Sequence, residues 1–354
     1  MNDARGKKVF VGLSGGVDSS VSALRLKQQG FRVVGVFIKV WHPDFLICDW
    51  ERERLDAMRV AAHLEIPFLT FDAEDVYKRD VADYMIAEYE AGRTPNPDVM
   101  CNKHVKFGVF LDFALEKGAD YIATGHYAQI EKDEGGYHLL RGKDNNKDQT
   151  YFLWTLTTEN LSKILFPIGN APKNEVRKEA EEAGLPTARK HDSQGVCFLG
   201  KIDMKEFLSH YVNSQSGNVL DEKGNAIGQH DGALFYTLGQ RHGFTLSSVD
   251  THRTPYYVIA KDLKKNTLTV SPEASTIERS EIKLTGINQI QELKNYAEVT
   301  AQFRYRQKPF AVRLVSISDS DVTLEILEET ETPSVGQSCV LYSGDECLGG
   351  GIIS

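Results

Sequence analysis

The residues best suited to chemistry in this chain form a turn of serine and glycine near its start. Residues 8–13 predict a strand, Ser14-Gly15-Gly16 interrupt it, and the residues that follow have helical spacing. Glycines let the backbone approach an anion, and a helix N-terminus attracts negative charge. Because the turn lacks the lysine of G-x-x-x-x-G-K-[ST] loops, it suits the binding of pyrophosphate better than γ-phosphoryl transfer. Asp18 is either a helix cap or a ligand of Mg²⁺ beside that pyrophosphate, and a plain strand-to-helix turn is the alternative reading of the whole stretch.

The cysteines are the second group able to do chemistry. They are odd in number, scattered, and without a C-x-x-C pair: Cys48, Cys101, Cys197, Cys339 and Cys347. This argues against a secreted disulfide framework and against a structural zinc site. Cys101 is close to basic residues at 103–106, and Cys197 follows a basic cluster at 189–191. Nearby cations favour the reactive thiolate, whereas an inert buried thiol is the alternative for each cysteine.

Alternating strands and helices must position these groups. Residues 31–41 form a continuous apolar run, as in a buried parallel strand. The other expected elements are helices at 53–67, 81–92, 107–119 and 174–186 and strands at 68–73 and 120–130. This alternation predicts a doubly wound parallel sheet, whose ligands bind beyond the carboxyl ends of the strands. Ser14, Ile38 and Gly125 all fall at such ends.

The pattern changes after about residue 200. Residues 216–244 contain short strand-like pieces, 254–271 predict a hairpin, and almost all of the chain after 280 alternates as strands do. We therefore predict a parallel-sheet domain (1–203), a small β-rich middle domain (204–275) and a C-terminal β-barrel (276–354).

Composition sets the class of protein. The net charge is −9, which argues against a strongly basic nucleic-acid binder but allows local basic clusters, such as those at 240–243 and 304–308. No apolar run is long enough to span a membrane, and the N-terminus has no apolar signal region. We expect a monomeric cytoplasmic protein whose thiols are kept reduced.

The turn S-G-G-x-D-S resembles the PP-loop of the ATP pyrophosphatases, which cut ATP between the α and β phosphates. The stretches at 92–107, 123–130, 147–156 and 192–200 together resemble one member family, the bacterial tRNA-specific 2-thiouridylases. The resemblance covers essentially the whole chain. It implies a PP-loop (adenine nucleotide alpha hydrolase-like) fold and ATP-dependent thiolation of the wobble uridine of tRNA in the anticodon.

The resemblance also implies a set of ATP contacts. The family places ATP, with Mg²⁺, against Gly12, Leu13, Ser14, Gly15, Gly16, Val17, Asp18, Ser19, Ile38 and Gly125. Ile38 replaces a frequent methionine, and His126 beside Gly125 is expected only to pack.

The resemblance assigns the sulfur chemistry to two cysteines. Cys197 receives sulfur from a persulfide donor protein, and Cys101 is the second catalytic cysteine, which leaves a Cys101–Cys197 disulfide that must be reduced. Asp98 is expected to manage the uridine N3 proton or to orient the base, in an extended loop fixed by two prolines. A simple turn aspartate is the alternative.

The same resemblance implies tRNA contacts in three segments. They are Asn96, Pro97 and Asp98, then Lys147, Asp148 and Gln149, then Arg304, Tyr305 and Arg306. Strand alternation would place Arg304 and Arg306 on one face, as phosphate binding requires. Two other functions compete: a PP-loop ligase acting on a small molecule, and an RNA-binding module with a relic nucleotide site.

Overall fold

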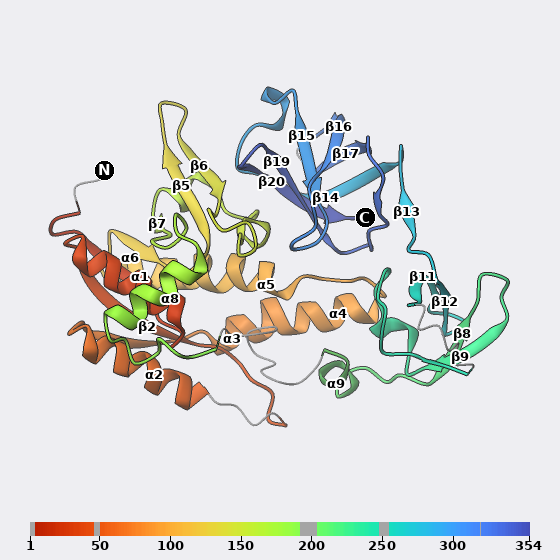
Figure 1. The fold of residues 1–354 in the computed structure, drawn as a ribbon, viewed down its shortest axis with the longest axis horizontal. Helices are drawn as coiled ribbons and strands as arrows, with labels where there is room; N and C mark the ends of the chain where they lie inside the picture. The colour runs from red at the N-terminus through yellow and green to blue at the C-terminus, as the bar shows by residue number, and fades with distance from the viewer. Residues whose placement is uncertain (1–3, 46–49, 192–203, 248–254, 319) are drawn as a thin grey trace.

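The computed structural model describes residues 4–45, 50–191, 204–247, 255–318 and 320–354 (Figure 1). It consists of an α/β part, a small middle sheet and a barrel. None of the helices in these ranges is long and apolar enough to cross a membrane.

The first part is built on a parallel sheet of order β3-β2-β1-β4-β7. Its strands are β1 (Lys8–Gly12), β2 (Arg32–Lys39), β3 (Phe68–Asp72), β4 (Tyr121–Ala123) and β7 (Ile164–Leu165). Strand β1 lies between β2 and β4, so the loops after these three strands meet at one edge of the sheet. The predicted doubly wound sheet is confirmed.

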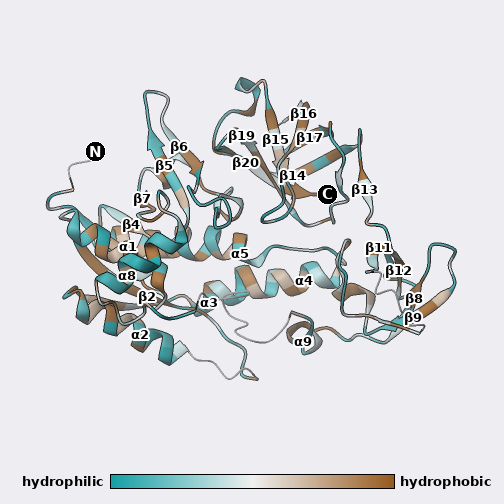
Figure 2. Cartoon of the chain, viewed as in Figure 1, coloured by the Kyte–Doolittle hydropathy of each residue, from teal (hydrophilic) through white to brown (hydrophobic). Residues whose placement is uncertain are grey.

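Helices cover both faces of this sheet. Val9 and Val11 pack with one group, whereas Phe10, which points to the opposite face, packs with the other. The first group is α1 (Val17–Gln28), α2 (Trp50–His63) and α8 (Lys173–Glu182). The second is α3 (Glu74–Tyr77), η1 (Lys78–Asp83), α4 (Tyr84–Glu90), α5 (Pro97–Met100), η2 (Cys101–Val109) and α6 (Phe110–Glu116). Hydrophilic residues follow the outer sides of α2 and α8 (Figure 2).

The predicted strand over 120–130 is wrong in its length. Strand β4 ends at Ala123, and β5 (Ala128–Lys132) pairs instead with β6 (Tyr137–Arg141) in a hairpin. Between the two strands Gly125 lies against the start of α1, where an added Cβ would be 2.7 Å from the backbone nitrogen of Ser19.

The middle part is a small sheet of order β10-β9-β8-β12-β11. The strands are β8 (Gly217–Leu220), β9 (Ala226–His230), β10 (Thr245–Leu246), β11 (Tyr257–Asp262) and β12 (Thr267–Ser271), preceded by α9 (Met204–Ser209). The predicted hairpin is β11–β12, and its turn uses Asn266 at φ +50°. Val219, Val258 and Leu268 form its core.

The last part is a closed barrel, as predicted. Its strands pair in the order β14-β17-β16-β15-β19-β20, and β20 closes on β14. They are β14 (Glu281–Gln289), β15 (Val299–Gln302), β16 (Phe310–Ile317), β17 (Asp321–Ile326), β19 (Ser338–Ser343) and β20 (Glu346–Ile353). A short pair, β13 (Thr276–Ile277) and β18 (Thr330–Glu331), flanks the barrel.

The β5–β6 hairpin joins the first part to the barrel. Strand β6 pairs with β20, with Leu140 opposite Glu346 and Leu139 opposite Cys347. Residues of the barrel, among them Val340 and Tyr342, belong to the same hydrophobic core as one face of the parallel sheet. The barrel and the α/β part therefore share buried surface.

Candidate functional site

The predicted PP-loop lies between β1 and α1. Gly15 has φ +70°, and an added Cβ would be 2.6 Å from a backbone oxygen of α2, so only glycine fits here. The backbone nitrogen of Gly16 donates to Ser14 Oγ at 3.3 Å, and Ser14 Oγ lies 3.2 Å from Ser19 Oγ. Gly16 is the N-cap of α1 and has no side chain to bond the free N–H groups of the first turn. The serine hydroxyl groups therefore lie beside an uncapped helix N-terminus, which suits an anion.

The strand ends bring other predicted contacts to this loop. An added Cβ at Gly12 would lie 3.8 Å from Ile38 Cδ1, at the end of β2. Gly125, after β4, packs directly on the backbone of Ser19. The structure thus gathers these residues from three adjacent strands, although their contact with ATP stays a prediction.

Two apolar residues in the predicted set have buried side chains, and Ser19 is buried as well, at 5% exposure. Leu13 and Val17 belong to the core, and the Leu13 N–H donates to Val36 O at 2.8 Å. Neither side chain faces the loop's open side, so a contact of Val17 with a ligand would be through its backbone.

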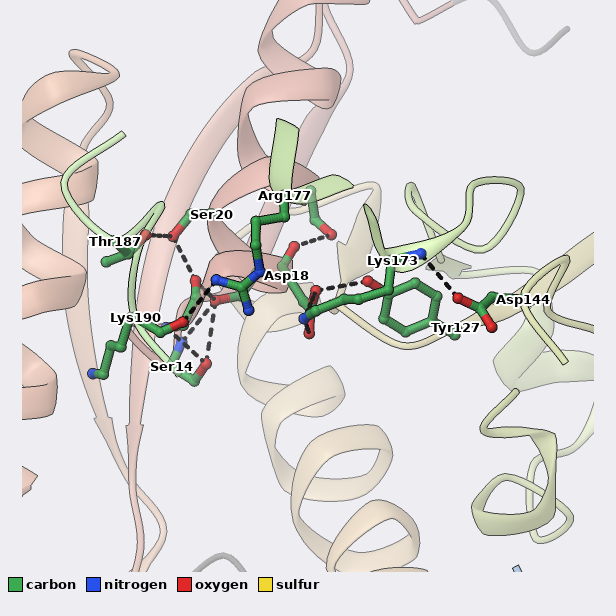
Figure 3. A network of polar contacts seen from close by, with 12 residues as sticks. Ser14, Asp18, Ser20, Tyr127, Asp144, Lys173, Arg177, Thr187 and Lys190 are labelled. Carbon is green, nitrogen blue, oxygen red and sulfur yellow. Dashed lines mark hydrogen bonds and ion pairs between the residues drawn. The ribbon is translucent and has the colours of Figure 1, made fainter. Parts of the chain in front are cut away.

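Asp18 has partners that the sequence did not predict. Lys173 Nζ lies 2.7 and 2.8 Å from the two carboxylate oxygens, and Tyr127 donates its hydroxyl hydrogen to Oδ1 at 2.8 Å (Figure 3). The Lys173 N–H in turn donates to Asp144 Oδ2 at 2.9 Å. A lysine from α8 therefore supplies, beside the PP-loop, the cation that the loop itself lacks. The helix predicted at 174–186 begins one residue after Lys173, so the sequence predicted no role for this lysine.

The segment after α8 is also tied to the loop (Figure 3). Ser20 Oγ lies 3.0 Å from Thr187 Oγ1, and Arg177 donates to the carbonyl oxygen of Lys190 at 3.0 Å. The Lys190 ammonium group pairs with Asp56 at 3.0 Å. The basic cluster at 189–191 thus has an internal partner. Cys197, whose reactivity was predicted from that cluster, lies outside the described residues.

Cys101 lies where the helix type changes, directly after α5. The predicted extended loop is wrong: Asn96 caps α5, since its Oδ1 accepts from the N–H groups of Asp98 and Val99 at 3.1 and 3.3 Å. Pro97 occupies the first helical position, where its missing N–H costs nothing. Cys101 then begins the π-helical η2 and is 3% exposed.

One of the basic residues that follow Cys101 in the sequence has a lowered pKa. Burial lowers the pKa of His104, and the charge of Lys103 lowers it further, so this imidazole is neutral at pH 7. Burial raises the pKa of Asp98, an effect partly opposed by the positive charge of Lys106. A carboxyl group with a raised pKa is a suitable proton donor or acceptor beside a base.

His126 packs, as expected. Its Nδ1 lies 2.7 Å from Thr124 Oγ1, and the Phe107 and Phe166 rings lie 5.7 and 5.9 Å from its ring. Burial holds the pKa of His126 well below 6.5, so the side chain is neutral.

The segment 147–149 is largely internal. The Asp148 carboxylate is buried and pairs with Arg141 at 2.7 Å, and it accepts the Thr150 hydroxyl at 2.9 Å. Gln149 Oε1 accepts the N–H of Tyr127 at 2.9 Å. Contact of this segment with tRNA stays a prediction.

The strand predicted around Arg304 is wrong. Strand β15 ends at Gln302, and the next residues form a turn in which Arg306 has φ +65°. Arg304 pairs with Glu331 at 2.6 Å, and Arg306 Nε donates to Asn146 O at 3.2 Å. The two arginines therefore do not share a strand face, yet the turn lies directly against the 144–149 loop.

The described residues contain no group of three or more His, Cys, Asp or Glu side chains that could hold a metal ion.

Comparisons with known proteins cover the chain from end to end. Family profiles described as tRNA methyl transferase HUP domain, tRNA methyl transferase PRC-barrel domain and Aminomethyltransferase beta-barrel domain match residues 7–201, 205–272 and 278–353. A tRNA-specific 2-thiouridylase MnmA of Enterococcus faecalis is 47% identical over 100% of this chain and 96% of its own length. One from Streptococcus thermophilus has the same identity and coverage. A solved U34-tRNA thiolase from Methanococcus maripaludis overlaps at a TM-score of 0.37 with 17% identity, covering 59% of this chain and 65% of its own.

Proposed function

Because the chain belongs to the family of tRNA-specific 2-thiouridylases, we propose that it thiolates the wobble uridine of tRNA at C2 in an ATP-dependent reaction. The observation that carries this proposal is the full-length relationship at 47% identity, joined to a lysine-free PP-loop in which Ser14 Oγ lies 3.2 Å from Ser19 Oγ.

ATP is the proposed co-substrate of the loop. The Gly15-Gly16 turn directly precedes the α1 N-terminus, where phosphate oxygens would bind, and Ser14 and Ser19 supply hydroxyl groups beside it. Lys173 is the cation placed to neutralise phosphate charge. Ile38 and Gly125 would lie on the nucleoside side, at the neighbouring strand ends.

Mg²⁺ fits this site only as an ion that arrives with the nucleotide. Asp18, in the first turn of α1, offers a carboxylate at the loop, and Lys173 already pairs with it. Mg²⁺ commonly takes most of its ligands from phosphates and water, so one carboxylate suffices. The ion would neutralise the departing pyrophosphate.

The sulfur chemistry is assigned to two thiols. Adenylation of the uridine O2 makes that oxygen a leaving group, which departs as AMP. The Cys101 thiolate attacks the Cys197 sulfur that bears the persulfide, forming a Cys101–Cys197 disulfide and releasing hydrosulfide, which attacks C2. An external dithiol then supplies the two electrons that reduce the disulfide. Because Cys101 is buried, its thiol must become accessible before this step.

Asp98 and the Arg304 turn are the proposed tRNA contacts nearest to Cys101. The Asp98 carboxyl group, whose pKa is raised by burial, would contact a base edge, and Asn96 precedes it at the helix cap. Arg304, Tyr305 and Arg306 would receive the backbone together with Lys147, while Pro97 packs below the base. Asp148 and Gln149 would contribute through the loop that they stabilise, since their side chains are bonded internally.

The reaction also needs a separate sulfur donor, because ATP and tRNA supply no sulfane sulfur. That donor would be a protein carrying a persulfide. We also propose that the chain acts as a cytoplasmic monomer.

Thiolated tRNA is detected directly by its retardation in gels containing a mercury compound. Purified protein, unmodified tRNA, ATP and a persulfide donor should produce the retarded band, and Cys197→Ser or Cys101→Ser should abolish it. Cys339→Ala is the matched control, since that thiol is buried in the barrel. A small-molecule ligase would instead release pyrophosphate without tRNA and would tolerate Cys101→Ser.

A further inference from the structure

The connection between α4 and α5, residues 92–96, touches every part of the chain; we call it the strap. In Figure 1 it passes between α4 and the C-terminal barrel. Thr94 Oγ1 lies 3.2 Å from Thr237 Oγ1 of the middle part, and the Thr94 N–H donates to Val335 O, near the barrel, at 2.8 Å. Gly92 lies so close to Leu263, in the β11–β12 turn, that an added Cβ would overlap the leucine side chain.

Backbone packing holds the strap from the barrel side. Gly336 has φ +91°, and an added Cβ would lie 2.9 Å both from the Thr94 nitrogen and from Arg93 Cβ. Real Cβ atoms do not approach this closely, so any side chain at Gly336 must push the strap away.

The backbone between the strap and the predicted catalytic thiol has little conformational freedom. Pro95 and Pro97 restrict the backbone, and Asn96 fixes the start of α5. The Cys101 N–H then bonds to the carbonyl oxygens of Asp98 and Pro97. A displacement at Thr94 is therefore transmitted to Cys101 rather than absorbed by a flexible loop.

The strap also borders the turn proposed to receive tRNA. A cavity of about 160 Å³ separates them, lined by Thr94, Asn96, Tyr151, Arg304, Tyr305 and Ser338 among others. Arg304 links the barrel side of this cavity to the middle part, because its guanidinium pairs with Glu331 and donates to Leu238 O of the middle part at 2.7 Å.

We infer that the strap is a positioning element for sulfur transfer, with Thr94 as its central residue. Its contacts with the middle part and the barrel hold Cys101 in position. This inference rests on the proposed function and adds to it a role for residues that do not touch the reacting atoms.

The test compares two alanine substitutions at glycines with positive φ. Gly336→Ala must displace the strap, whereas Gly344→Ala has φ +55° and no atom within 4 Å of the added Cβ. In single turnover, we expect Gly336→Ala to slow sulfur transfer by roughly tenfold or more, because catalysis is sensitive to displacements on the order of 1 Å. The tRNA-dependent release of pyrophosphate, which precedes transfer, should change less than about twofold, and Gly344→Ala should leave both rates unchanged.

A second pair of variants keeps the backbone unchanged. Thr94→Val and Thr237→Val should each slow transfer by roughly fivefold, the double variant no more than either, and Thr94→Ser should restore the rate. This pair decides the matter if Gly336→Ala does not fold.

The outcomes are separable from those of the proposed function. Absence of thiolation by the wild-type chain would overturn that function. Thiolation by the wild type at a rate matched by Gly336→Ala and Thr94→Val would overturn the positioning role alone. Equal losses in pyrophosphate release and in transfer would also overturn it, since they indicate general damage to the fold.

Discussion

The ion pair between Lys173 and Asp18 can be tested most sharply with Lys173→Met, which keeps the length and apolar stem of the side chain but removes the ammonium group. The lysine side chain is 13% exposed and the aspartate 32%, so the pair lies between the exposed and buried limits. Exposed pairs contribute up to about 1 kcal/mol, and breaking a buried pair costs about 3–5 kcal/mol. We expect the free energy of unfolding to fall by about 1–3 kcal/mol.

The same substitution should weaken ATP binding. A charge-assisted hydrogen bond to phosphate contributes about 1.5–3 kcal/mol, which corresponds to a rise in the Kd for ATP of roughly 10- to 100-fold. Urea denaturation and titration calorimetry measure the two effects. Lys178→Met is the matched control, because that lysine is on the same helix, is 75% exposed and pairs with Glu182 at 3.5 Å.

Two results would contradict this reasoning. If Lys173→Met loses stability but binds ATP like the wild type, then Lys173 is a structural partner of Asp18 and not a phosphate ligand. If Lys178→Met weakens ATP binding to the same degree, then the effect is one of general charge.

Three other predictions follow from pKa shifts and close packing. Burial raises the pKa of Asp98, so the contribution of this carboxyl group to stability falls as pH rises above the ordinary value of 3.8. In urea denaturation at pH 7, Asp98→Asn should raise the free energy of unfolding by an amount on the order of 1 kcal/mol. The same variant should lose thiolation. Hydrogen bonds to Glu346 and, less strongly, to Asp133 raise the pKa of His138, so their contribution to stability is complete below pH 6.5 and lost at higher pH. In the same measurement, His138→Gln should lower the free energy of unfolding by up to about 1 kcal/mol at pH 6 and by little at pH 9. Gly125→Ala should destabilise the fold by about 1–3 kcal/mol and weaken ATP binding, measured by thermal unfolding and calorimetry, because its Cβ would meet the backbone of α1.

The sequence predicted the elements that depend on local pattern. The apolar run of β2 and the glycine turn before α1 specify a strand and a helix start whatever surrounds them, and both are found where expected. Gly125 and Ile38 were placed correctly at strand ends because parallel order follows from strand–helix alternation.

The failures concern one contact between distant residues and two local backbone features. Lys173 and Asp18 are separated by 155 positions, and no periodicity within either helix records their pairing. The alternation around Arg304 resembled a strand, but Arg306 adopts a positive φ and the chain turns there. The helix cap at Asn96 could have been predicted, because Asn-Pro followed by an aspartate is a recognised helix start. The two prolines of this segment instead favoured the prediction of an extended loop.

The pairing of β6 with β20 has a consequence for how the chain comes to be folded. During synthesis the α/β part emerges first, yet one edge of its hairpin and part of its core are completed only by residues near position 347. Until then an apolar strand edge is open to pairing with other molecules. Expression of residues 1–203 alone should therefore yield an aggregation-prone fragment, and co-expression of the barrel as a separate polypeptide should recover soluble material.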